Sequence, residues 1–245
     1  MNTEQFWQLI EATQASTQDE QLGLFARELL QLAPQELIEF ERLFVEHSFA
    51  AYSWDLWLVP WLCTGGMCTD DDFLDFRSWL ISRGRSAYEA ALNDADALAD
   101  EMRQADYPQF EDFGYAPSKA YRAITGGEFP DFHFEHPKEP VGGDWMRAPL
   151  KDTSDSELLN RCIVFDRLGC DEFAVIEQRF PKIWALCVER GTIRTPETKP
   201  ESAQRSFPTP EEIAETVDPN LAKTDFAAYL KATGDALQKA YTRKE

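Results

Sequence analysis

Apolar residues recur at helical spacing along this chain, and this periodicity constrains the fold more than any other feature. Three segments near the start follow or approximate the i, i+3, i+4, i+7 rule, and the third opens on Pro34, which the first turn of a helix tolerates. The positions that share a face are Phe6, Leu9, Ile10 and Thr13, then Leu22, Phe25, Leu29 and Leu32, and then Leu37, Phe40 and Phe44. Strand-like alternation is almost absent. We therefore predict a mostly α fold, a single orthogonal bundle of many helices.

Turn-forming residues concentrate between residues 107 and 150. They are Pro108, Gly114, Pro117, Gly126, Gly127, Pro130, Pro137, Pro140, Gly142, Gly143 and Pro149. This composition predicts a loop-rich insertion with one short helix at 118–124. Phe129, Phe132, Phe134 and Trp145 give the loop apolar anchors, so we expect it to pack across the helices.

The rest of the chain divides around this insertion. We predict a helical domain over 1–191, with a core at 1–106 before the insertion and further helices at 151–191 after it. Residues 192–209 are polar and contain proline, which indicates a linker. Two helical segments follow within 210–245, and the apolar face of the last one predicts that they dock on the body.

The chain is strongly acidic. It has 44 Asp and Glu residues against 24 Lys and Arg residues, which gives a formal net charge of −20. Such a surface repels nucleic-acid phosphates and anionic membranes, and the basic residues form no cluster that would reverse the field. An acidic surface accelerates the capture of basic molecules, so we expect a basic protein partner and neither nucleic acid nor membrane. The alternative is that the acidity serves solubility alone.

Targeting signals are absent from the pattern of the chain. The first residues lack the basic start and apolar middle of a signal peptide, and no uncharged apolar run is long enough to cross a bilayer. The five cysteines, an odd number, stand mostly among apolar neighbours: Cys63, Cys68, Cys162, Cys170 and Cys187. Without an export signal, such cysteines are typical of reduced core thiols. We therefore expect a cytoplasmic protein; the oligomeric state is not indicated.

Aromatic residues, carboxylates and one arginine crowd together within residues 53–81. If Thr69 caps a helix, the aspartates at 70–72 fall in its first turn, where exposed amides favour negative charge by about 0.3 to 1 kcal/mol each. Asp55 stands among tryptophans, so its burial would demand a partner for its charge. Arg77 is the candidate partner, in a bidentate pair that joins two helices. The alternative is that Arg77 binds a substrate.

Metal and nucleophilic sites have weaker support. Clustered aspartates suit Mg²⁺ or Ca²⁺, but successive helical residues point in different directions and the spacing of a calcium loop is absent. Cys63 and Cys68 with His133 and His136 contain zinc donors, although their spacing departs from finger patterns. Cysteine or serine catalysis needs a base; His47 is interpreted as structural, and the roles of His133 and His136 stay open. We predict no catalytic residue, no metal and no cofactor.

Two tryptophans stand where the sequence predicts irregular backbone. Trp61 follows Pro60 and precedes a glycine pair, and Trp145 follows a second glycine pair closely. An indole on a loop is a frequent binding anchor. We therefore predict that Trp61 and Trp145 contribute to an exposed aromatic patch.

Several motifs in a fixed order resemble one bacterial family. They are Phe-Trp-x-Leu-Ile at 6–10, Ser-Trp-Asp-Leu-Trp at 53–57, Asp-Asp-x-Phe at 70–73, Phe-Arg-x-Trp-Leu-Ile at 76–81 and Gly-Arg-x-x-Tyr at 84–88. On these residues, about the first half of the chain resembles the domain-of-unknown-function family numbered four thousand two hundred and forty. The resemblance implies that the Asp-Asp-x-Phe and Phe-Arg-x-Trp positions define the fold or a site, and it carries over no catalytic residue.

Two functions from different classes fit these features. We favour an acidic, non-enzymatic interaction module that binds a basic protein partner, in an immunity-like or regulatory role. The alternative is an enzyme or small-ligand binder whose Asp71, Asp72, Arg77 and His133 converge in a cleft between the helical half and the loop-rich middle. The binding residues predicted across both functions are Trp61, Asp71, Asp72, Arg77 and Trp145.

Overall fold

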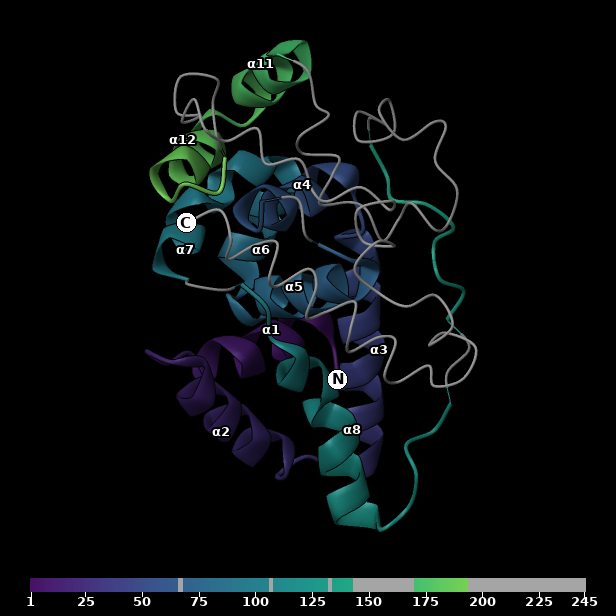
Figure 1. Ribbon diagram of the computed structural model, residues 1–245. Coiled ribbons are helices and arrows are strands. Elements are labelled where there is room, and N and C mark those ends of the chain that lie inside the picture. The colour runs from purple at the N-terminus through teal and green to yellow at the C-terminus, as the bar shows by residue number, and fades with distance from the viewer. Residues whose placement is uncertain (66–67, 106–107, 132–133, 143–169, 194–245) are drawn as a thin grey trace, which may run out of the picture. The chain divides into compact units, whose positions relative to one another are not determined.

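The computed structural model describes residues 1–65, 68–105, 108–131, 134–142 and 170–193 (Figure 1). These residues are mostly helical, as predicted. Their elements are α1 (Thr3–Ala12), α2 (Gln18–Leu29), α3 (Pro34–Ala50), α4 (Trp54–Cys63), α5 (Asp70–Ser82), α6 (Arg85–Asn93), the 3-10 helix η1 (Ala95–Leu98), α7 (Ala99–Gln104), α8 (Glu111–Thr125), α11 (Cys170–Arg179) and α12 (Pro181–Glu189).

All described residues fall in one compact unit. Contacts within the chain separate a unit at Met1–Arg194 from a second unit at Thr195–Glu245. The predictions about Trp145, His133, most of the linker and the C-terminal helices lie outside the described residues. The same holds for the helices expected over 151–169.

Short polar motifs specify where helices begin. Asn2 and Gln5 exchange side-chain to backbone hydrogen bonds of 2.9 Å at the start of α1, which satisfies two amides that the helix leaves unpaired. Thr69 and Asp72 do the same for α5, where the Thr69 amide donates to Asp72 Oδ2 at 2.8 Å. Thr69 therefore caps α5 and places the aspartates at 70–72 in its first turn, as the sequence indicated.

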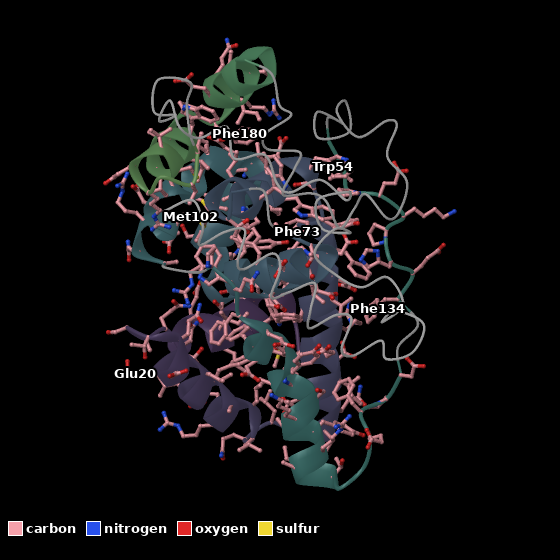
Figure 2. All side chains as sticks on the ribbon, viewed as in Figure 1. Glu20, Trp54, Phe73, Met102, Phe134 and Phe180 are labelled. Carbon is pink, nitrogen blue, oxygen red and sulfur yellow. The ribbon has the colours of Figure 1, made fainter. Side chains whose placement is uncertain are left out.

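Aromatic side chains fill the core between the first five helices and α8. Phe25 of α2 stacks on Phe113 of α8 with ring centroids 4.0 Å apart, and Phe6 of α1 packs on Phe40 of α3 at 4.7 Å. Each buried phenylalanine contributes about 2 to 3 kcal/mol through removal of apolar surface from water. Figure 2 shows Phe73 of α5 in the interior, where it is fully buried.

Helix α8 is longer than the sequence predicts. Turn formers favoured a short helix at 118–124, but one helix covers 111–125 and packs against α2, α3 and α5; Figure 1 shows it running alongside α3. Gly114 serves close approach rather than a turn, because a Cβ there would lie 2.9 Å from Ser78 Oγ on α5. Pro117 lies inside α8, where it costs one backbone hydrogen bond, and it is buried. The loop-rich segment therefore starts after α8.

The described loop after α8 packs on the junction between α3 and α4, as expected of the insertion. Val141 accepts a backbone hydrogen bond of 3.0 Å from Trp54 and donates one of 2.9 Å to Tyr52. The ring of Phe134 meets the Phe49 ring edge-on at 6.2 Å. This pairing anchors the loop to the body at both main chain and side chain.

Helix α12 completes the described unit by packing on α4, η1 and α7. Its apolar face buries Ile183, Trp184, Leu186 and Cys187. Ile193 is also buried, with 2% of its surface exposed. The packed body thus includes Ile193, and the prediction of a linker over 192–209 falls mostly outside the described residues.

Candidate functional site

The N-terminal ends of α5 and α8 bring four carboxylates together. Asp71, Asp72 and Asp75 lie on the first turns of α5, and Glu111 opens α8. Two hydrogen bonds join the segments: Gln109 Nε2 donates to Asp72 Oδ1 at 3.0 Å, and the amide of residue 110 donates to the Asp75 carbonyl at 3.1 Å. We call Asp71, Asp72, Asp75 and Glu111 the acidic cluster.

The acidic cluster holds more negative charge than its surroundings neutralise. Burial, and after it the charges of Glu111, Asp72 and Asp71, raise the pKa of Asp75 to about 6. Burial also raises the pKa of Asp72, but hydrogen bonds from Thr69 and Gln109 outweigh burial and lower it overall. Within the described residues, none of the four carboxylates forms an ion pair with a cation. The cluster therefore keeps an unrelieved negative potential.

Apolar surface adjoins these charges. Leu74, which follows Asp72 by two residues on α5, leaves 43% of its surface exposed, and Tyr115, one turn after Glu111 on α8, leaves 52% exposed. Asp71 and Glu111 are exposed themselves. The cluster thus presents carboxylates beside apolar groups, a mixture that suits the long stems and charged ends of lysine and arginine.

Another strained carboxylate lies on α3. Glu41 Oε2 is buried and has no hydrogen-bond partner among the described residues. Burial raises the pKa of Glu41 to about 7. Like Asp75, Glu41 is therefore a carboxylate whose charged form the fold disfavours.

Arg77 does not belong to the acidic cluster. Its guanidinium is 3% exposed, and it donates from Nη1 to the Ser48 carbonyl at 3.0 Å and from Nε to the Phe73 carbonyl at 3.3 Å. The guanidinium carbon also lies 5.0 Å from the centroids of the Tyr52 and Phe73 rings. Burial lowers the pKa of Arg77 to about 10. Arg77 thus satisfies a carbonyl in the last turn of α3 and joins α3 to α5.

The predicted Asp55–Arg77 pair is wrong. Asp55 lies in the first turn of α4 and accepts a hydrogen bond from Arg179 Nη2 on α11, with 30% of the Asp55 side chain exposed. Its partner comes from 124 residues further along the chain. Sequence spacing pointed to the nearest arginine, whereas the docking of a distant helix decides the pairing.

The predicted aromatic patch is wrong at Trp61. Trp61 is 4% exposed and belongs to the core, because every residue of α4 from Leu56 to Leu62 is buried. His136 lies at the surface of the loop, edge-on to the rings of Phe49 and Tyr52 at 4.9 and 5.0 Å. His47 packs among aromatic rings of the core, and burial lowers its pKa. Of the predicted binding residues that the structure describes, it brings together Asp71 and Asp72.

A second polar region surrounds α12. In contrast to the acidic cluster, its carboxylates are paired with amides or arginines. The buried carboxylate of Asp96 accepts hydrogen bonds from the amides of Lys182 and Ile183, each at 2.9 Å to Oδ1, and so caps α12 from another helix. In return, Arg190 after α12 donates to the Met102 carbonyl at 2.7 Å, at the end of α7. We call the surface of α4, η1 and α7 under α12 the docking face.

Ion pairs flank this double cap. Arg103 pairs with Glu189 at 2.7 Å between Nη1 and Oε2, and the Asp55–Arg179 pair lies on the neighbouring helices. Figure 2 labels Met102 and Phe180 beside this region, away from Glu20 on α2. Sequence reasoning missed all of these partners. Pro181 signals the start of a helix, but nothing local indicates which carboxylate will cap it.

Neither a metal-binding group nor a membrane-spanning helix occurs among the described residues. In the part of the chain that the structure describes, no three His, Cys, Asp or Glu side chains are grouped so as to hold a metal ion. Among the same residues, no helix combines the length and apolar character needed to cross a bilayer.

The fold and the two polar regions define an acidic helical domain with an added C-terminal helix pair. A family model described as "Protein of unknown function (DUF4240)" matches residues 1–123, and the chain belongs to this family. The predicted resemblance is therefore confirmed. The match runs from α1 into α8, so α11 and α12 lie outside it. No curated protein and no solved structure matches the chain.

Proposed function

We propose that this protein is a non-enzymatic interaction module that binds a basic protein partner, in an immunity-like or regulatory role, and that the acidic cluster is its contact surface. One observation carries the proposal. Four carboxylates crowd together without a neutralising cation among the described residues, and their mutual repulsion contributes to the raised pKa of Asp75. A bound cationic side chain would relieve this repulsion.

A protein partner fits the cluster better than a metal ion does. The carboxylates spread over two helices, and Asp72 is already engaged with Thr69 and Gln109. Exposed Leu74 and Tyr115 add apolar area that a metal would not use. Lysine and arginine side chains can contact both the carboxylates and the apolar area, because their aliphatic stems cover apolar surface while the charged end meets a carboxylate.

The overall charge supports the same partner class. A formal net charge of −20 steers cations toward the surface and repels nucleic acids and anionic membranes. Cys63, Cys68 and Cys187 are free thiols, which supports a reducing, cytoplasmic location. The alternative enzyme or small-ligand site gains no such support, since the Arg77 guanidinium donates into the core.

The proposal is tested with a variant that neutralises the acidic cluster. Asp71→Asn, Asp75→Asn and Glu111→Gln are combined in the full chain, and Asp72 is kept because it caps α5. Binding of a fluorescent lysine-rich peptide is measured by anisotropy at low and high salt. We expect strong salt dependence for the parent chain and binding weakened about 5-fold or more in the triple variant.

A matched control separates the site from the total charge. Glu28→Gln, Asp100→Asn and Glu128→Gln remove as many negative charges from exposed positions on α2, on α7 and after α8. This control should bind within about 2-fold of the parent. Proteins retained by the immobilised chain at low salt are then compared among the three forms. Equal losses in both triple variants, or peptide binding that ignores salt, would contradict the proposal.

A further inference from the structure

Two thiols from distant parts of the sequence meet under α12. Cys63 is the last residue of α4 and Cys187 lies in α12, and their sulfur atoms are 3.3 Å apart although 124 residues separate them in the chain. Both cysteines are free. Cys63 is half-buried and Cys187 is fully buried, so a small oxidant reaches the pair from the Cys63 side.

Neighbouring groups shift the pKa values of these two thiols in opposite directions. The hydrogen bond between the two thiols raises the pKa of Cys63 and lowers that of Cys187. Burial raises the pKa of Cys63 as well, whereas Thr192 and the charge of Arg190 help lower that of Cys187. Cys187 is thus the sulfur that gives up its proton more readily, and the thiolate is the form that attacks sulfur.

We propose that Cys63 and Cys187 form a redox-sensitive modification site, in which a reversible disulfide locks α12 onto the docking face of the family domain. The geometry supports it because the two sulfurs are in contact at 3.3 Å, and a disulfide bond is about 2.05 Å long. The inference is independent of the proposed function, since no residue of the acidic cluster takes part.

The reaction balances with hydrogen peroxide as the oxidant. The Cys187 sulfur, as its thiolate, attacks one peroxide oxygen and the O–O bond breaks. The released hydroxide combines with the proton that Cys187 gave up, which yields water and leaves a sulfenic acid on Cys187. The Cys63 sulfur then attacks the Cys187 sulfur, forming the S–S bond and breaking the S–O bond. The departing hydroxide takes the Cys63 proton as a second water. Two thiols are oxidised to one disulfide, and one peroxide is reduced to two waters.

The position of the bond gives it a structural consequence. Residues 1–123 match the family, and α12 at 181–189 lies outside that match and is held to it by noncovalent contacts of Asp96, Arg103 and Arg190. Those contacts open and close together when α12 undocks. A covalent link between the end of α4 and α12 prevents α12 from undocking, and reduction of the disulfide by thiols makes undocking possible again.

The first test identifies the bond in the unaltered full chain. The protein is treated with hydrogen peroxide, remaining thiols are alkylated, and peptides are mapped by mass spectrometry without reduction. We expect one cross-linked species that joins the peptides of Cys63 and Cys187, is lighter by two hydrogens than the sum of its parts, and disappears on reduction. Cross-links confined to other cysteines, or alkylation of Cys63 unaffected by peroxide, would overturn the proposal.

The second test measures whether oxidation holds α12 on the docking face. Thermal melting and amide exchange of α12 are compared between oxidised and reduced protein. Oxidation should raise Tm by about 5 °C or more and slow exchange at the amides of Lys182 and Ile183. Cys63→Ser and Cys187→Ser should each abolish both effects, and Cys68→Ser, at another buried thiol, should keep them. An oxidised parent chain with unchanged α12 exchange would refute the lock even if the bond forms.

Discussion

The acidic cluster and the docking face use the same residue types in opposite ways. On the docking face, Asp96 receives two backbone amides, and Asp55 and Glu189 each receive an arginine. In the acidic cluster, no described cation pairs with the four carboxylates, and the pKa of Asp75 rises. Carboxylates with an amide or arginine partner hold α11 and α12 in place. Carboxylates without such a partner repel one another, and a cation from outside would reduce that repulsion.

The comparison separates carboxylates that hold helices together from carboxylates that we propose as a contact surface. A carboxylate that is buried against helix amides is already satisfied and has nothing left for a partner. A carboxylate that is crowded by its own kind disfavours its charged form and favours whatever neutralises it. The predictions below test whether the matched residues stabilise the fold and whether the unmatched ones weaken it.

Removing the buried cap should have the largest effect. Asp96→Ala leaves the amides of Lys182 and Ile183 without their acceptor, and we expect a loss of about 3 kcal/mol in the free energy of unfolding. Urea denaturation measures the loss, and exchange of the Ile183 amide should accelerate. Asp100→Ala, at an exposed position on α7, should change stability by less than about 0.5 kcal/mol. An equal loss in both variants would remove the distinction between a buried cap and a surface charge.

Neutralising the buried carboxylate on α3 should stabilise the protein. The folded pKa of Glu41 is about 7 and its ordinary value is 4.5, so between these values the folded state binds more protons and stability falls as pH rises. Glu41→Gln removes this penalty, and we expect a gain of about 2 kcal/mol at pH 8 that shrinks toward zero near pH 4. Denaturation at both pH values checks the sign. A variant less stable than the parent at pH 8 would mean that Glu41 has a partner.

Neutralising Asp75 should also stabilise the protein, but by less than neutralising Glu41. Its folded pKa of about 6 exceeds its ordinary value of 3.8, so its contribution to stability is lost as pH rises between these values. Because solvent screens a partly exposed group, we expect Asp75→Asn to add about 1 kcal/mol at pH 7 and nothing near pH 4. Added salt should shrink the gain by weakening repulsion from Glu111. A gain that persists unchanged at pH 4 would exclude charge as its cause.

Breaking the exposed ion pair between Asp55 and Arg179 should have the smallest effect on stability. Asp55→Asn breaks the contact with Arg179, whose side chain is 53% exposed, and we expect a loss of about 0.5 kcal/mol. The double variant with Arg179→Gln should be no less stable than the single variants, which a double-mutant cycle at low salt measures. A coupling as large as the effect of Asp96→Ala would show that the rim of the docking face is as important as its buried centre.

Local chemistry made much of the fold predictable. The helical spacing of Phe6, Leu9 and Ile10 places α1, and Pro34 marks the first turn of α3. Thr69 caps α5 because its hydroxyl is three residues from an acid that can return the hydrogen bond. These features depend on neighbours within one or two turns, so a sequence displays them in full.

Predictions from local sequence were wrong where contacts with distant segments determine the structure. Gly114 and Pro117 have the composition of a turn, yet α8 continues through both because its partners on α3 and α5 favour a close, buried helix. Trp61 follows a proline, yet it lies in a stretch of α4, residues 56–62, that is buried throughout. Arg77 was assigned to Asp55 from spacing, and the carbonyl of Ser48 that it actually meets carries no sequence signal.

The helical class, the acidity, several helix starts and the family over residues 1–123 can be recognised from the amino-acid order alone. The pairing of charges, the contact between two cysteines and the surface that each helix covers became known from the three-dimensional fold. The physical reason is range: caps and amphipathic faces arise from residues a few positions apart, whereas ion pairs and thiol contacts across 124 residues depend on how whole helices dock.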